Sequence, residues 1–176
     1  MLDAFRSAPD MDRQGEVSDL ASAQEYVDRL LEKRRRAYAI EHAGELVGLV
    51  GVVVDEVNRS GWVFYWMHAD HRGRGLTSRA VASVADHLLA EPPAGEGLER
   101  LELGHRVNNP GSGGVALAAG FVLEGRERAK FLIDGERHDV LTYGRLVPDP
   151  WPKAAPLPIV PWGSTALSKD SEGMST

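Results

Sequence analysis

The stretch that decides the fold is H-A-D-H-R-G-R-G-L-T-S, which runs from His68 to Ser78. It follows a strand-like run and leads into a segment whose apolar residues recur at helical spacing. Its two glycines let the backbone approach a ligand closely, and a helix N-terminus presents unpaired N–H groups with a partial positive charge. The sequence therefore predicts a loop that binds an anionic group, such as a phosphate, at the start of a helix.

The residues around this loop predict alternating strands and helices, which indicates an α/β fold. Helices are expected over 22–36 with Ser22 as the cap, from Leu76 to Leu88, and over 113–119 with Ser112 as the cap and Gly120 at the end. Strands are expected at 37–41, 46–54, 62–68, 98–107, 121–124, 129–133 and 138–146. Asp134-Gly135 is typical of a hairpin turn between the last two. The basic run K-R-R-R is interpreted as the solvated end of the first helix.

Composition and charge exclude several classes of protein. The chain has 176 residues, of which 43% are hydrophobic and 26% charged, as in a globular domain. Its net charge of −6 argues against a nucleic-acid platform, and a chain without cysteine has neither disulfides nor cysteine-ligated metals. No apolar run approaches membrane-spanning length, and no His, Asp or Glu cluster has metal-ligand spacing. We expect a cytoplasmic protein with no metal, and with neither nucleic acid nor membrane as a partner.

The chain divides into one domain and a tail. We expect a domain over residues 1–147, with an irregular lead-in at 1–20, followed by a Pro-rich tail at 148–176 that has no core of its own. Three apolar residues are candidates for pinning the tail to the domain: Trp151, Ile159 and Trp162.

Two common phosphate-binding loops fit the glycine stretch poorly. A P-loop needs a Gly-Lys pair followed by a hydroxyl residue, which this chain lacks at the required spacing. A dinucleotide-binding loop needs a third glycine, where this sequence has Ser78, and an acidic residue on the next strand tip. Both classes remain weak matches, so the rest of the sequence must identify the ligand.

Two further blocks complete a family pattern. N-N-P-G-S supplies Asn109 and Ser112 as N-x-x-S, and a short helix later the chain has Gly120-Phe121. The last block has six matching positions: Asp134, Gly135, Asp139, Val140, Tyr143 and Leu146. With the R-G-R-G loop, these blocks resemble the GCN5-related N-acetyltransferases (GNAT), in the branch of the ribosomal-protein-alanine acetyltransferases, over residues 22–147.

The resemblance implies a GNAT fold and acetyl-CoA as cosubstrate. The fold is a mixed, mostly antiparallel central sheet with helices on both faces, here shortened at the N-terminus. In the family the loop N–H groups bind the pyrophosphate of coenzyme A, a splayed strand pairs with the pantetheine arm, and the serine lies near the thioester sulfur. The implied cofactor contacts are Met67, His68, Arg72, Gly73, Arg74, Gly75, Leu76, Thr77, Asn109 and Ser112.

Direct transfer of the acetyl group to a primary amine needs a base for the amine and an acid for the leaving thiolate. The resemblance makes Ser112 the candidate acid, with Tyr143 as the runner-up. His68 and Glu102 are the candidate bases, on strands expected to flank the cleft, since histidine and glutamate side chains both serve as general bases in enzymes. Two other histidines are expected at surface or hairpin positions: His105 and His138.

The N-terminus departs from the family pattern. Family members usually begin with a strand and a helix ahead of the helix expected at 22–36, and residues 1–20 do not predict that strand. The first strand present would be a bare sheet edge, which we expect the Pro-rich tail or a second subunit (a homodimer) to cover. The acceptor stays open between a protein N-terminus, a small amine and an amine-bearing antibiotic. The alternative function is a non-catalytic acyl-CoA-binding or regulatory module.

Overall fold

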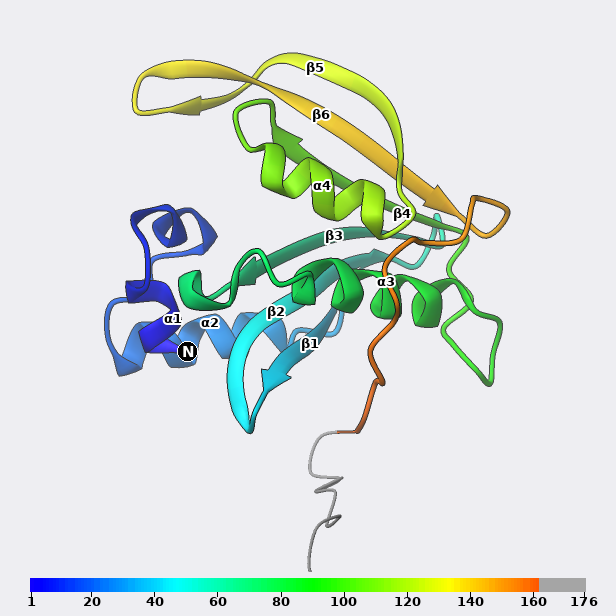
Figure 1. Cartoon of the computed structure of the whole chain (residues 1–176), viewed down its shortest axis with the longest axis horizontal. Helices are drawn as coiled ribbons and strands as arrows, with labels where there is room; N and C mark the ends of the chain where they lie inside the picture. The colour runs from blue at the N-terminus through cyan, green and yellow to red at the C-terminus, as the bar shows by residue number, and fades with distance from the viewer. Residues whose placement is uncertain (162–176) are drawn as a thin grey trace, which may run out of the picture.

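A computed structural model describes residues 1–161 as a six-stranded sheet with helices on both faces (Figure 1). The strands lie in the order β1-β2-β3-β4-β6-β5, and every neighbouring pair is antiparallel except β3 and β4. Their bounds are β1 Arg35–His42, β2 Glu45–Asp55, β3 Ser60–Met67, β4 Arg100–Arg106, β5 Val122–Ile133 and β6 Glu136–Leu146. The predicted α/β class with a mixed, mostly antiparallel sheet is confirmed.

Two groups of helices cover the sheet (Figure 1). One face carries α3 (Leu76–Leu89) and α4 (Pro110–Ala118), which the loop after β3 and the loop after β4 introduce. The other face carries α1 (Leu2–Arg6), the 3-10 helix η1 (Pro9–Gln14) and α2 (Leu20–Leu30), while a short 3-10 turn, η2 (Ala69–His71), follows β3. Within residues 1–161, no helix combines the length and the apolar character needed to span a bilayer.

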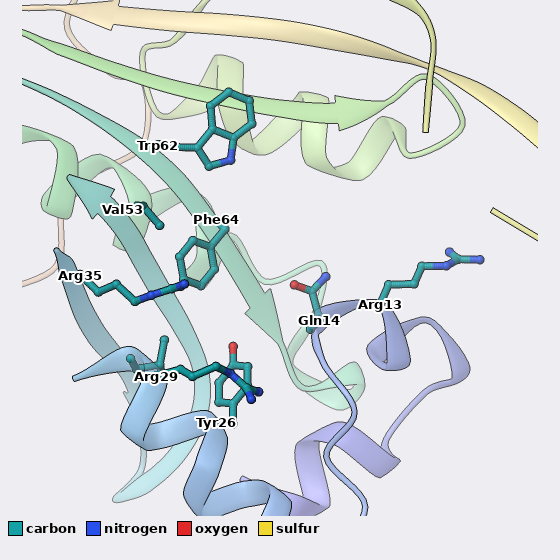
Figure 2. A pocket seen from close by; sticks show the side chains of 9 residues that line it. Arg13, Gln14, Tyr26, Arg29, Arg35, Val53, Trp62 and Phe64 are labelled. Carbon is teal, nitrogen blue, oxygen red and sulfur yellow. The ribbon is translucent and has the colours of Figure 1, made fainter. Parts of the chain in front are cut away.

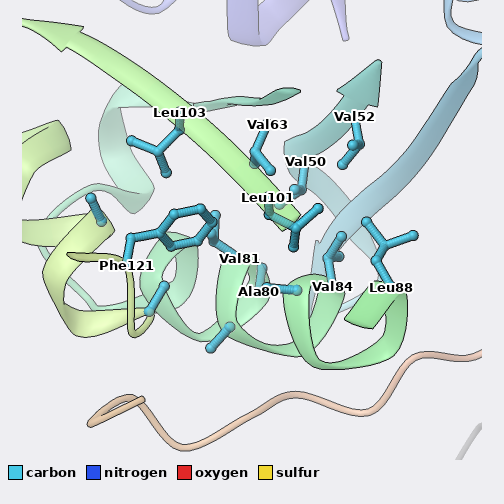
Figure 3. Packing of buried hydrophobic residues seen from close by; sticks show 14 of the residues in the cluster. Val50, Val52, Val63, Ala80, Val81, Val84, Leu88, Leu101, Leu103 and Phe121 are labelled. Carbon is cyan, nitrogen blue, oxygen red and sulfur yellow. The ribbon is translucent and has the colours of Figure 1, made fainter. Parts of the chain in front are cut away.

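Alternation along β2 explains why both faces of the sheet are covered. Val50 and Val52 are completely buried in the cluster that contains α3, whereas Leu49 belongs to the cluster of α1 and α2. Val81 and Leu88 of α3 pack against the valines (Figure 3). Each fully buried side chain of this kind contributes about 1.5–3 kcal/mol. This core therefore holds α3 against the sheet face that carries Val50 and Val52.

The N-terminal residues build the second apolar cluster. Phe5 of α1 packs edge-on against Tyr26 of α2 and Trp66 of β3, with ring centroids 5.2 and 5.4 Å apart. The indole N–H of Trp66 donates to the Tyr26 hydroxyl (3.1 Å), and Met11 of η1 is 1% exposed. The expectation of an irregular lead-in at residues 1–20 is therefore wrong. Helices this short are marginal alone, so their burial against the sheet stabilises them.

The second helix begins and ends earlier than the sequence predicts. Asp19, not Ser22, is its N-cap: the Asp19 carboxylate accepts from the Ser22 backbone N–H (2.8 Å), and the Ser22 hydroxyl accepts from the Asp19 N–H (3.1 Å). This reciprocal pair satisfies two free donors at the start of α2. The helix ends at Leu30, and Arg35 and Arg36 of the basic run begin β1. The interpretation of K-R-R-R as a helix end is wrong.

Two other element boundaries differ from expectation. Asn109, not Ser112, caps α4, and Gly120 follows the helix with a φ of +84°, which confirms its predicted place at the end. The strands expected at 121–124 and 129–133 are one strand, β5, interrupted by a bulge at Ala129 (φ 52°). The Ala129 N–H donates to the Asp139 carboxylate (2.7 Å), which satisfies the displaced backbone group. The hairpin turn at Asp134-Gly135 is confirmed.

The described part of the tail packs along α3 and α4 (Figure 1). Ala154 and Leu157 contact the main core, and the Ala154 N–H donates to the Ala118 carbonyl (3.1 Å). Trp151 is 85% exposed, so it does not pin the tail, and Trp162 lies outside the described residues. The tail up to residue 161 therefore leaves β1 as the sheet edge, and a second subunit over this edge stays a prediction.

Candidate functional site

Strands β3 and β4 are paired over only a short length and then diverge. Their ladder runs from Ser60 with Arg100 to Trp62 with Glu102. Beyond it, β3 continues with β2 as its partner and β4 continues with β6. The facing backbone groups of the two strands have no ladder partner within residues 1–161, and such groups need hydrogen bonds. This opening, the β3–β4 wedge, suits an extended ligand that bonds to backbone.

The loop after β3 forms an open site at the start of α3. Gly73 and Gly75 both have a φ of +74°, which favours glycine, and a Cβ on either would meet no atom within 4 Å. Helix α3 has no side-chain cap and no acidic residue in its first turn. Within residues 1–161 nothing accepts a hydrogen bond from the N–H groups of Gly73, Arg74 and Gly75. Free donors at the positive end of a helix dipole fit a phosphate group.

The two arginines of the loop have different surroundings. The Arg72 guanidinium donates to both carboxylate oxygens of Asp10 in η1 (3.0 Å each) and to the Met67 carbonyl (3.1 Å). Arg72 therefore fastens the loop to η1 and to the end of β3. Arg74 is exposed and forms no ion pair with any residue of the described chain, so its charge is available to a ligand. Nothing in the sequence pattern pointed to Asp10.

Asn109 and Ser112 come together at the start of α4. The Asn109 side-chain carbonyl accepts from the Ser112 backbone N–H (3.3 Å), and its amide donates to the Ser112 hydroxyl (3.0 Å). The Tyr65 hydroxyl of β3 donates to the Ser112 backbone carbonyl (3.2 Å), which ties the strand to the helix. Burial raises the pKa of Tyr65 to about 12. Because the Ser112 hydroxyl accepts from Asn109, its own proton is available to another acceptor.

A buried histidine–tyrosine pair lies next to α4. The His105 Nδ1 is 2.8 Å from the Arg106 carbonyl, which can only accept, so Nδ1 carries the proton. The Nε2 then accepts from the Tyr143 hydroxyl (3.1 Å), and burial raises the pKa of Tyr143. The expected surface position of His105 is wrong, since it is 7% exposed. Alternation with Leu101 and Leu103 was the signal that identifies its buried face.

The two candidate bases already have partners. The Nδ1 of His68 accepts from the Asp70 backbone N–H (3.2 Å), and its Nε2 lies 3.1 Å from a carboxylate oxygen of Asp3. Glu102 accepts from Arg100 (2.9 Å) through one oxygen, and its side chain remains 40% exposed. Glu102 therefore lies at the narrow end of the wedge, and His68 lies at the wide end, where it joins the loop to α1.

Three histidines gather beside the loop. The His71 ring packs edge-on against His42 (5.5 Å between centroids) and against His68 (5.7 Å). The geometry is that of edge-to-face ring packing rather than of converging ligands. Across residues 1–161, no group of three or more histidine, aspartate or glutamate side chains is placed to hold a metal ion.

A pocket of about 350 Å³ opens on the sheet face that carries α2 (Figure 2). Arginines and aromatic rings dominate its wall, which is formed by Arg13, Gln14, Tyr26, Arg29, Leu30, Arg35, Val53, Trp62 and Phe64. We call it the arginine pocket. The sequence did not predict it, because its residues come from five separate elements: η1, α2, β1, β2 and β3.

The known sequences that this chain resembles are acetyltransferases. The model of the acetyltransferase (GNAT) domain matches residues 1–122. The ribosomal-protein-serine acetyltransferase of Escherichia coli (strain K12) is 33% identical over 114 residues, which are 64% of this chain and 61% of that protein. The putative ribosomal N-acetyltransferase YdaF of Bacillus subtilis (strain 168) is 27% identical over 135 residues, 72% of each chain. The chain thus spans about three-fifths of the Escherichia coli relative.

Solved structures show the same fold. A chimera of spermidine N-acetyltransferase SpeG from Vibrio cholerae and hSSAT superposes with a TM-score of 0.67 at 22% identity, over 82% of this chain and 88% of that one. The apo form of RimL, a ribosomal alpha-N-protein acetyltransferase, superposes with a TM-score of 0.63 at 23% identity, over 72% of this chain and 78% of that one. At these identities the likeness concerns the fold alone.

Proposed function

Because the chain belongs to the GNAT acetyltransferase family, we propose that it binds acetyl-CoA and transfers the acetyl group directly to a primary amine. The observation that carries the proposal is the junction of the β3–β4 wedge with the loop from Gly73 to Gly75. The loop offers free N–H donors at an uncapped helix start, and the wedge offers unpaired backbone beside it. A ligand with a pyrophosphate and an extended amide-bearing arm needs both features.

In this proposal the loop holds the pyrophosphate mainly through backbone. The N–H groups from Gly73 to Thr77 donate to it, and Arg74 adds an unpaired positive charge. Arg72 acts indirectly, since its guanidinium keeps the loop attached to Asp10 and to the end of β3. The unpaired edge of β3 up to Met67 bonds the arm.

Acetyl-CoA supplies an activated thioester, so the protein must only accept a proton from the amine and provide one for the departing sulfur. We assign the second role to Ser112, whose hydroxyl proton is not used by Asn109. We assign the first role to Glu102, which has an oxygen beyond the one that accepts from Arg100 and is partly exposed. His68 is the weaker candidate, because both of its ring nitrogens already have partners.

Calorimetry with acetyl-CoA, CoA and ATP on the full-length protein, followed by thiol release across a panel of amines, tests the proposal. We expect micromolar-range binding of acetyl-CoA and CoA, no comparable binding of ATP, and turnover on at least one amine. Preference for ATP would overturn the loop assignment. Binding of acetyl-CoA with no thiol release on any amine would favour the non-catalytic module. A cytoplasmic location and a homodimer remain predictions.

A further inference from the structure

The arginine pocket lies where an acceptor would approach the wedge. Trp62, which lines it, is the last residue of β3 that pairs with β4, and its register partner is Glu102. Phe64, also in its wall, is the next residue of β3 on the same face and lies in the diverging part of the strand. The side chains of register partners stand on the same face of a sheet. The pocket therefore begins beside the carboxylate proposed to receive the amine proton.

The charge of this pocket is positive and largely uncompensated. Arg13, Arg29 and Arg35 line it, and no acidic residue of the described chain does. Only Arg35 has a carboxylate partner, Glu32, at 3.3 Å, and that pair is exposed enough for solvent to weaken it. The net charge of the whole chain is −6, so a cluster of three arginines is more positive than the chain's overall charge would lead one to expect.

A second pocket of similar size contains arginines whose positive charge is accompanied by glutamates. It has a volume of about 310 Å³ and is lined by two arginines and three glutamates. There Arg36 pairs with Glu96 (2.8 Å), and two further glutamates, Glu56 and Glu91, line the same pocket, so carboxylates accompany its arginines. In the arginine pocket the Arg29 guanidinium lies over the Tyr26 ring (5.8 Å to the centroid), and planar guanidinium groups are suited to bind carboxylates in a bidentate fashion.

The positive electrostatic potential of the arginine pocket extends to β4. Burial and the charge of Arg13 lower the pKa of Arg106, and Asp10 offsets this in part. Arg106 lies on the same strand face as Glu102 by alternation. A second positive charge on the acceptor would therefore meet repulsion from the arginines that line the pocket.

Resting on the proposed function, we infer that the acceptor is an amine whose own chain carries carboxylates close to the amine. The ammonium group lies toward Glu102 at the narrow end of the wedge. The carboxylates lie toward Arg13, Arg29 and Arg35, and the intervening atoms contact Trp62 and Tyr26. This dipolar arrangement selects against polyamines and against polycationic antibiotics, because their second positive charge would stand among the arginines.

Matched peptides test this inference on the full-length protein. We would compare peptides that begin Ser-Glu-Glu, Ser-Gln-Gln and Ser-Lys-Lys, together with spermidine, by thiol release with acetyl-CoA. We expect kcat/KM to fall in that order, by about tenfold or more from the acidic to the neutral peptide, with a difference that shrinks at high salt. Calorimetry of each peptide with the CoA-bound protein measures the same preference independently of turnover.

Substitutions of the pocket arginines test whether the preference for acidic peptides depends on the arginine pocket. Arg29→Gln and Arg13→Gln should each reduce the ratio of kcat/KM on the acidic peptide to kcat/KM on the neutral peptide by about three- to tenfold, and the double variant should reduce it more. Arg128→Gln, at an exposed position on β5, removes the same charge outside the pocket and should leave the ratio unchanged.

The outcomes distinguish a failure of this inference from a failure of the proposed acetyl transfer. Equal or better binding of the neutral or basic peptides, or an acidic preference that survives the double variant, overturns the inference and leaves acetyl transfer intact. Acidic preference in calorimetry without any thiol release supports the pocket and refutes the proposed activity. Loss of the preference in the Arg128→Gln control also overturns the inference, because it would mean that overall charge, not the pocket, is sensed.

Discussion

The loop at Gly73–Gly75 and the arginine pocket both suit anions, yet they are built in opposite ways. The loop uses backbone N–H groups of consecutive residues, which glycine conformations and a helix start bring into place. The pocket uses guanidinium groups from η1, α2 and β1, which only packing brings together. A site made from consecutive backbone can be recognised in a sequence, whereas a site made from distant side chains cannot.

The largest effect on ligand binding is expected from a substitution at Gly75, in the loop that uses backbone N–H groups. Gly75→Glu adds a side chain and a negative charge where phosphate oxygens are proposed to bind, so acetyl-CoA affinity should fall by about 100-fold or more. Gly135→Glu is the matched control: Gly135 also has positive φ (+81°) and open space around a Cβ, in the β5–β6 hairpin turn. Calorimetry measures both variants. Equal affinities in two folded variants would reject the loop as the phosphate site.

Ser112 tests whether the start of α4 takes part in chemistry or only in capping. Ser112→Ala keeps the backbone N–H that bonds to Asn109, so the helix cap survives. Loss of a proton donor should lower kcat by about 100-fold with acetyl-CoA affinity unchanged. Ser112→Thr retains a hydroxyl and should keep most of the activity. A kcat in the alanine variant close to that of the wild type would leave Ser112 with a structural role alone.

Asp10 tests the contribution of side chains to the loop. Asp10→Asn removes the charge that holds Arg72, and a partly exposed ion pair of this kind contributes little, so acetyl-CoA should bind about threefold more weakly. Asp12→Asn makes the same change in η1 at a residue that does not contact Arg72. Tighter binding in Asp10→Asn would contradict the positioning role, since it would show that Arg72, once released, binds the ligand directly.

The smallest effect concerns Tyr65, which ties β3 to α4. Tyr65→Phe should lose about 1 kcal/mol of unfolding free energy at pH 7, as expected for one buried hydrogen bond. The folded-state pKa of Tyr65, about 12, lies above the ordinary value of 10.0, so the folded protein retains a proton that the unfolded chain releases. Stability should therefore fall as pH rises from 10 toward 12, and less steeply in the variant.

Tyr38 provides the control for this experiment. Burial also raises the pKa of Tyr38 to about 12, but its hydroxyl has no hydrogen-bond partner within residues 1–161. In Tyr38→Phe, stability should fall less steeply as pH rises from 10 toward 12. The unfolding free energy at pH 7 should stay the same, because this variant breaks no hydrogen bond. Urea unfolding at a series of pH values measures both variants. If Tyr65→Phe and Tyr38→Phe lost equal amounts of unfolding free energy at pH 7, the hydrogen bond from Tyr65 to Ser112 would not contribute to stability.

Much of the fold could be predicted because its signals are local. The alternation of β2 and β4, the helical spacing of α3 and the turn at Asp134-Gly135 all depend on neighbours in the chain. The predicted loop lies where expected, at the start of α3. His105 belongs to the same alternating pattern as Leu103, and the prediction failed there because a polar residue was assigned to the surface by type.

The errors occur where tertiary contacts replace local signals. The helices of residues 1–20 have too few periodic residues to be predicted, and Phe5 becomes informative only against Tyr26 and Trp66. The β5 bulge depends on the Asp139 carboxylate of the neighbouring strand. Asp10 gains its partner Arg72 from a loop far along the chain.

The sequence by itself therefore determined the fold class, the family pattern and the glycine loop at the start of α3, because glycines, caps and strand periods act over a few consecutive residues. Only the tertiary structure decided which residues flank the site. The partners of His68 and Glu102, and the cluster of Arg13, Arg29 and Arg35, arise from elements that meet in space. Charge interactions of this kind depend on distance and burial, which no local pattern in the chain encodes.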